Sequence, residues 1–282
     1  MAEEQFYRPA SPQEVCDLLA QLGDKARLLA GGTDLMVAIN EREFFPVALI
    51  YIGNSGLDYI TAEGGKLIIG AATPYSEIME SDLVKQKAPL LVEVISHLAS
   101  PAIRNVGTIG GNLGTASPAA CSAVGLMGLG ASVKIVSKDG ERMVAIEGFF
   151  KGPGENVLNP NEFIQEVIIP AQTAGAKWAY RKLGKRRAQS LAVVSVAIYC
   201  PMDNGICRGI RIALGAVAPT PLLATQAMGL LEGRKLEEKI IVDAAKAAAE
   251  ATNPIDDQRS SAWYRRRATE ALVRQLLRQI SQ

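Results

Sequence analysis

The stretch Thr108-Ile109-Gly110-Gly111-Asn112-Leu113 repeats the pattern of an earlier one, Ala30-Gly31-Gly32-Thr33-Asp34-Leu35. In both, a Gly-Gly pair is followed by polar residues and then a leucine. A backbone without Cβ atoms can approach a ligand closely and present its N–H groups. We expect each pair at or near a helix start, with Thr33 capping the first helix, where free N–H groups and the helix dipole favour an anion. The two segments predict a pocket for a long anion such as a dinucleotide; two tight turns without a ligand are the alternative.

Bulk composition narrows the class of protein. The chain has 282 residues, enough for one large domain or two modest ones, and its 48% hydrophobic and 21% charged residues are typical of a soluble globular protein. A net charge of +1 gives no field to attract nucleic acid or an anionic membrane. No apolar run approaches the roughly 20 residues that span a bilayer. The N-terminus, Met1-Ala2-Glu3-Glu4-Gln5, lacks the basic and apolar regions of a signal peptide, so we expect a cytoplasmic protein.

Cysteine and histidine are too sparse for a metal centre. The chain has four cysteines, at positions 16, 121, 200 and 207, and one histidine, His97. None of the cysteines forms a C-x-x-C pair. Zinc and iron–sulfur sites need ligands at close spacing. We therefore assign no metal ligand to this chain, and expect its cysteines to be reduced.

Hydrophobic patterns divide the chain into two α+β units. The small polar stretch at residues 170–175 predicts a boundary, giving domains over 1–172 and 173–282. In the first unit, Ser11, Pro12 and Glu14 indicate the start of a helix, and residues 116–130 read as one closely packed helix. The second unit reads as a three-stranded sheet followed by three helices. These elements cover Trp178–Leu183, Ala192–Cys200 and Cys207–Leu214, then Leu222–Leu231, Lys239–Ala251 and Ser261–Ile280.

The two common nucleotide-binding signatures do not occur. The chain has no G-x-x-x-x-G-K-[ST] stretch, which argues against a P-loop. The glycine-rich run from Gly125 to Gly130 lacks the G-x-G-x-x-G spacing, and it follows a helical pattern rather than a strand. Helix packing at small residues explains that run.

Several motifs resemble a known family over most of the chain, roughly residues 6–277. Both Gly-Gly segments resemble its flavin-binding motifs, and the second, from Ile103 to Leu113, is highly specific. The stretches Gly70–Thr73, Ala213–Pro221 and Asp256–Arg266 match further motifs. The family is the FAD-binding (medium) subunit of molybdenum hydroxylases, which includes xanthine dehydrogenase and aerobic carbon monoxide dehydrogenase. The resemblance implies a two-lobed FAD-binding domain of the vanillyl-alcohol-oxidase (PCMH) type, followed by a smaller α+β domain.

The resemblance also implies which residues bind FAD. Lys182 resembles a lysine near the flavin ring, where a cation would tune the ring's electronics. Cys121 departs from the family, because many members carry an acidic residue here that can bond the ribose, and a thiol is a poor acceptor. The implied cofactor-binding residues are Leu28, Leu29, Ala30, Gly31, Gly32, Thr33, Asp34, Leu35, Gly107, Thr108, Gly110, Gly111, Asn112, Thr115, Ala120, Cys121, Phe163, Ile164 and Lys182.

By the same resemblance, this chain is an electron-transfer subunit without catalytic residues of its own. Electrons from [2Fe-2S] clusters on a small partner chain would pass via FAD to NAD⁺ or another acceptor. A large partner would hold the molybdopterin cofactor, in a dimer of heterotrimers. Two alternatives remain: a stand-alone FAD-dependent oxidoreductase, for which we find no convincing acid or base, and a scaffold subunit that has lost FAD.

Overall fold

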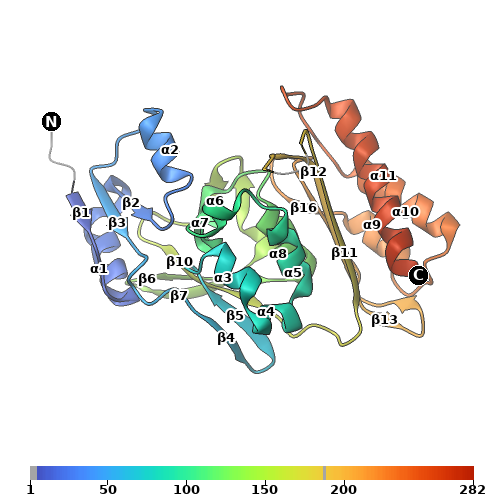
Figure 1. Ribbon diagram of the computed structural model, residues 1–282, viewed down its shortest axis with the longest axis horizontal. Helices are drawn as coiled ribbons and strands as arrows, with labels where there is room; N and C mark the ends of the chain where they lie inside the picture. Colours follow the sequence, from blue (N-terminus) through green and yellow to red (C-terminus); the bar gives the residue numbers. More distant parts are fainter. Residues whose placement is uncertain (1–4, 187–188) are drawn as a thin grey trace.

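Three main β-sheets follow one another across the computed structural model of the protein (Figure 1). The structure describes residues 5–186 and 189–282, so most of the acidic N-terminus, residues 1–4, lies outside it. Two small hairpins add to the sheets. Their strands are β8 (Phe150–Gly152) with β9 (Glu155–Asn156), and β13 (Met202–Asp203) with β14 (Ile206–Cys207).

The first lobe is a parallel three-stranded sheet with the order β1-β3-β2. Helix α1 connects the two outer strands, and the Ser11 side chain caps it by accepting from the Glu14 amide, as the sequence predicted. Val15 and Leu19 of this helix are buried. The elements are β1 (Gln5–Tyr7), α1 (Pro12–Leu22), β2 (Ala26–Leu29), α2 (Leu35–Asn40) and β3 (Ala48–Tyr51).

The second lobe is an antiparallel five-stranded sheet with the order β4-β5-β10-β6-β7. Its helices gather near the middle of the molecule (Figure 1). The strands are β4 (Ile60–Glu63), β5 (Lys66–Gly70), β6 (Ser132–Ser137), β7 (Gly140–Ala145) and β10 (Phe163–Ile169). The helices are α3 (Tyr75–Glu80), α4 (Asp82–Lys87), α5 (Pro89–Ser96), α6 (Pro101–Arg104), α7 (Ile109–Thr115) and α8 (Cys121–Leu129).

Helix α8 is surrounded by protein, and all nine of its residues are buried. It contacts α5 on one side and strands β12 and β15 of the third sheet on the other. The single helix expected over 116–130 is wrong. Ala116 takes a left-handed φ of +50° and ends α7, and a turn of residues 117–120 then precedes α8. Pro118, which lacks an N–H group, suits such a turn.

The third sheet has four strands in the order β11-β12-β15-β16, rather than the three expected. The extra strand is the pair Leu222-Leu223, which returns antiparallel to β15 after Pro219 and Pro221. A pair of apolar residues is too short to show the hydrophobic periodicity of a strand, so the sequence favours placing Leu222 and Leu223 in the following helix. The elements are β11 (Lys177–Gly184), β12 (Ala192–Cys200), β15 (Arg211–Gly215), β16 (Leu222–Leu223), α9 (Thr225–Leu231), α10 (Glu238–Glu250) and α11 (Ala262–Ser281).

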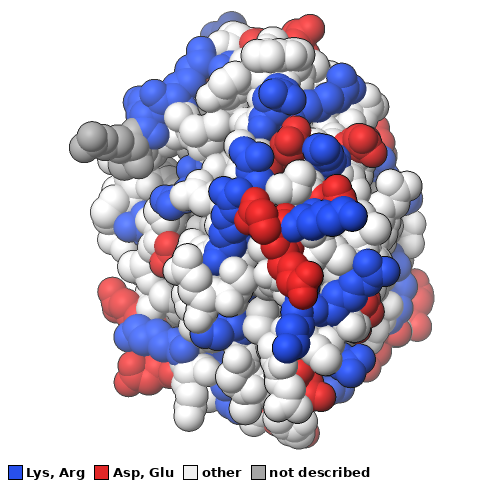
Figure 2. Space-filling model, turned by 90° about the vertical axis from the view of Figure 1, so that its right-hand side faces the viewer, with Lys and Arg blue, Asp and Glu red and all other residues white. Residues whose placement is uncertain are grey.

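Both faces of this sheet are covered. Every residue of β12 is buried, as expected of a central strand between two layers. One face packs on α8, and α9, α10 and α11 share a hydrophobic core with the other. Basic and acidic side chains are interspersed over the outer face of these last helices (Figure 2). Within the part of the chain that the structure describes, no helix has the length and apolarity needed to cross a membrane.

Candidate cofactor-binding site

The first Gly-Gly segment leaves β2 and presents a run of free N–H groups. Among the described residues, no protein group accepts a hydrogen bond from the amides of Gly31, Gly32, Thr33 or Asp34. The first three of these residues are only partly exposed, and Gly32 has a φ of +71°. Partly buried backbone donors need partners, so this segment is suited to an anionic ligand.

The helix after this segment is capped differently from our expectation. Asp34, not Thr33, is the N-cap residue of α2, and its side chain makes no capping hydrogen bond. Instead the Asp34 carboxylate lies 3.0 Å from the Thr115 hydroxyl of α7. The carboxylate thereby links the two Gly-Gly regions instead of closing its own helix.

The second Gly-Gly pair lies inside the first turn of α7, and its amides are already used. Gly110 N–H donates to the Ala71 carbonyl at 2.9 Å, and Gly111 N–H donates to the Thr108 side chain at 3.0 Å. A Cβ added at Gly110 would lie 2.6 Å from the Ala71 Cβ. The expectation of unpaired amides is therefore wrong at Gly110 and Gly111, because there the missing Cβ lets α7 dock on the end of β5.

The fold brings the two segments into direct contact. A Cβ at Gly31 would overlap the carbonyl oxygen of Val106, and one at Gly107 would lie 3.5 Å from the Thr33 hydroxyl. One at Gly111 would lie 3.9 Å from Ala30. At Gly31 the backbone of the first segment packs on the backbone of Val106 and Gly107, just before α7, and this contact supports the free amides.

A chain of hydrogen bonds that we did not anticipate fixes Asn112. The Tyr75 hydroxyl donates to Ser122 at 2.9 Å, and the Ser122 hydroxyl donates to Asn112 Oδ1 at 2.5 Å. Burial raises the pKa of Tyr75, so this donor stays protonated. Because Oδ1 is occupied, the amide NH₂ of Asn112 is the group left to face a ligand. Tyr75 and Ser122 carry no motif that would have identified them in the sequence.

Besides Thr108, which caps α7, four predicted residues have buried side chains. Ala120 and Cys121, at the start of α8, are 3% and 6% exposed, and Phe163 and Ile164 of β10 are 1% and 5% exposed. Phe163 and Ile164 belong to two different hydrophobic cores. Contacts of these two residues with a ligand would therefore go through the backbone, next to the bulge in β10.

The thiol of Cys121 lies beside a buried hydroxyl. Tyr180 of β11 is 6% exposed, and its hydroxyl has no hydrogen-bond partner among the described residues. Burial, with the neighbouring Cys121, raises the pKa of Tyr180. The Cys121 thiol itself contacts the Ala119 carbonyl at 3.8 Å. The Tyr180 phenol is thus a protonated, buried hydroxyl next to Cys121.

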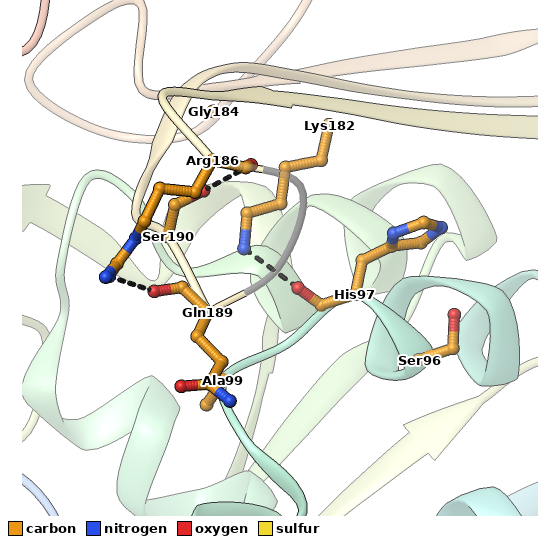
Figure 3. A pocket seen from close by; sticks show the side chains of 8 residues that line it. All are labelled: Ser96, His97, Ala99, Lys182, Gly184, Arg186, Gln189 and Ser190. Atoms are coloured by element: carbon orange, nitrogen blue, oxygen red, sulfur yellow. Dashed lines mark hydrogen bonds between the residues drawn. The ribbon is translucent and has the colours of Figure 1, made fainter.

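Lys182 lies in a separate small pocket, of about 70 Å³, between the end of α5 and the loop after β11 (Figure 3). Its Nζ donates to the carbonyl oxygen of His97 at 2.9 Å. Arg186 donates to the Gln189 carbonyl at 2.6 Å and shapes the other wall. No hydrogen bond within the described ranges joins Lys182 to either Gly-Gly segment. The pocket is lined by Ser96, His97, Ala99, Lys182, Gly184, Arg186, Gln189 and Ser190.

Comparison with known proteins assigns this architecture to a family. Residues 2–172 match the FAD-binding domain in molybdopterin dehydrogenase, and residues 178–280 match the carbon monoxide dehydrogenase flavoprotein C-terminal domain. The chain belongs to the FAD-binding medium subunits of the molybdenum hydroxylase family. It is therefore an oxidoreductase subunit.

Similarity to individual relatives extends over the whole chain. The glyceraldehyde dehydrogenase medium chain of Sulfolobus acidocaldarius is 31% identical over 280 residues, covering 99% of both chains. The carbon monoxide dehydrogenase medium chain of Afipia carboxidovorans is 34% identical, covering 95% of this chain and 93% of the relative. A solved carbon monoxide dehydrogenase from Hydrogenophaga pseudoflava superposes with a TM-score of 0.95 at 34% identity, covering 99% of this chain and 97% of that one.

Proposed function

We propose that this chain is the FAD-carrying electron-transfer subunit of a multi-subunit molybdenum hydroxylase. It receives electrons from [2Fe-2S] clusters on a small partner chain and passes them to NAD⁺ or another acceptor. A large partner holds the molybdopterin cofactor and the substrate, and the complex is a dimer of heterotrimers. The family model for the first 172 residues and the medium-chain relatives support this assignment.

The observation that carries the proposal is the run of free amides at Gly31–Asp34. Consecutive backbone N–H groups form a concave donor set suited to phosphate oxygens, without the need for lysine or arginine. The contact of Gly31 with the Val106 backbone fixes this run in place. Residues 28–35 would therefore hold the pyrophosphate of FAD.

The second Gly-Gly segment supports the free amides of the first segment. Thr108 caps α7 through Gly111, and Gly110 seats that helix on Ala71. Asn112 would offer its NH₂ group to the polar middle of the cofactor, and Thr115, whose hydroxyl donates to Asp34, would hold that carboxylate beside it. The backbone of Gly107, Ala120, Cys121, Phe163 and Ile164 would complete the binding site.

Bound FAD supplies an acceptor that can take electrons one at a time and release them as a pair. The Lys182 ammonium group would lie near its ring, where a positive charge favours negative charge on the ring. The four cysteines are free and buried, only Cys200 and Cys207 contact each other, and the described residues hold no group of three or more potential metal ligands. We therefore assign the iron–sulfur clusters to a partner, and reduced thiols favour a cytoplasmic complex.

We also propose that the two units divide near residue 172. Residues 163–169 form the central strand of the second lobe, whereas β11 begins at Lys177 and belongs to the third sheet. The intervening residues 170–176 form no helix or strand.

Flavin content and partner content together test the proposal. The full chain, purified from its native source, should carry one FAD and co-purify with a molybdopterin chain and an iron–sulfur chain. A colourless chain that binds no added FAD would instead indicate a scaffold. Oxidation of a substrate at full rate by the isolated chain would indicate a stand-alone flavoenzyme.

A further inference from the structure

One arginine guanidinium is buried where the C-terminal helix meets the third sheet. Arg265, in the first turn of α11, is 2% exposed. Its NH1 donates to the carbonyl oxygens of Val193 (2.9 Å) and Ala216 (2.7 Å), and its NH2 donates to Asp257 Oδ1 (2.7 Å). Desolvation offsets most of the attraction within a buried ion pair, so stability alone explains such a pair poorly. A planar guanidinium can, however, hold several hydrogen-bond acceptors in fixed directions, which suits it to positioning the segments that carry them.

The two carbonyls that Arg265 holds belong to segments that lead into the candidate site. Val193 is the second residue of β12, directly after the loop that lines the Lys182 pocket. Ala216 follows β15 with a φ of +62°, and its N–H donates to the Pro118 carbonyl at 2.9 Å. Pro118 belongs to the turn that positions Ala120 and Cys121.

Asp257 attaches the same guanidinium to a third segment. Its carboxylate also accepts from the backbone amides of Arg259 (2.8 Å) and Ser260 (3.1 Å). Burial opposes ionisation, but the hydrogen bonds from Arg259 and Arg265 outweigh it and hold the pKa of Asp257 well below its usual range. Within the same turn, the Gln258 carbonyl accepts a hydrogen bond from Lys185. The loop after β11 is thus tied to Asp257 as well as to β12.

We propose that Arg265, paired with Asp257, is a positioning residue for the cofactor pocket. It fixes the 117–121 turn and the 189–193 segment relative to each other, although it belongs to the C-terminal helix. The proposal rests on the proposed function, because it takes both segments as parts of the FAD site. A second ion pair on α11, between Arg278 and Glu238, lies on the exposed outer face and provides a matched control.

The test uses the full chain with the substitutions R265K, R265M and D257N, and with R278K as control. We measure FAD affinity by flavin fluorescence, unfolding temperature, and amide hydrogen exchange of the FAD-free chain. R265M and D257N should weaken FAD binding about tenfold, as expected for loss of a charged hydrogen bond. R265K should restore part of that loss, and a variant that combines R265M with D257N should bind FAD no more weakly than R265M alone. Exchange should rise in 117–121 and 189–193, and R278K should change neither FAD affinity nor this exchange.

The outcomes separate this proposal from the proposed function. If the wild-type chain binds no FAD, the proposed function fails, and the exchange pattern alone decides the role of Arg265. Exchange that stays unchanged, or that rises equally across α10 and all strands of the third sheet, overturns the proposal. So does FAD affinity within twofold of wild type in R265M.

Discussion

The substitution G31A tests whether the two Gly-Gly segments must touch. A Cβ at Gly31 would overlap the Val106 carbonyl oxygen and crowd the Gly107 Cα. Both obstacles are backbone atoms, so no side-chain rotation relieves the overlap, and the segments must move apart. Overpacking of this kind costs about 1–3 kcal/mol. Because FAD binding requires the two segments in contact, this strain should lower FAD affinity about 5- to 150-fold.

The assay is titration of the FAD-free chain with FAD, followed by flavin fluorescence, alongside thermal unfolding. The control is G229A, because Gly229 lies in α9 and a Cβ there meets nothing within 4 Å. G229A should leave FAD affinity unchanged. A G31A chain that binds FAD within twofold of wild type would refute the claim that the contact between Gly31 and Val106 shapes the FAD site.

Two further predictions concern an ion pair of the second lobe and the buried tyrosine that fixes Asn112. The substitution E162Q removes a carboxylate that accepts hydrogen bonds from two Arg142 nitrogens, at 2.7 and 2.8 Å. These hydrogen bonds are the main cause of the lowered pKa of Glu162. The substitution should therefore destabilise the fold by about 1–2 kcal/mol at pH 7. A carboxyl group with a lowered pKa contributes stability above its pKa in the unfolded chain, about 4.3, and this contribution is lost in acid. The difference in unfolding free energy between E162Q and wild type, measured by denaturant titration, should therefore shrink below that pH. A difference that stays constant with pH contradicts this prediction. The substitution Y75F removes the hydroxyl that donates to Ser122. It should lower the unfolding free energy by about 1 kcal/mol and weaken FAD binding, because Ser122 in turn orients Asn112. If both values stay unchanged, the chain of hydrogen bonds is dispensable.

The long periodic elements were predictable from sequence. Helix α1 has a capping serine followed by proline, and β12 is an apolar run interrupted only by Ser195, so local chemistry and burial agree. The short helix α2 was expected from the sequence, but two other short features were not. Strand β16 exists because β15 offers an edge, and the left-handed Ala116 that ends α7 is set by packing rather than by its own preference.

The candidate site was predictable as a motif but not as a geometry. The sequence identified both Gly-Gly pairs, yet it treated them as equivalent. The structure gives them different roles: Gly110 provides room for helix docking, while Gly31 and Gly32 leave their amides free. Long-range partners such as Ser122 for Tyr75 depend on tertiary packing, which no local pattern encodes.

The most direct test of the central claim is an NMR titration of backbone amides with FAD. The free N–H groups of Gly31, Gly32, Thr33 and Asp34 should show the largest shifts, and pyrophosphate alone should move the same resonances at higher concentration. The amides of Gly110 and Gly111, already bonded within the protein, should shift less. Saturation with FAD that leaves the Gly31–Asp34 amides unmoved would contradict the account.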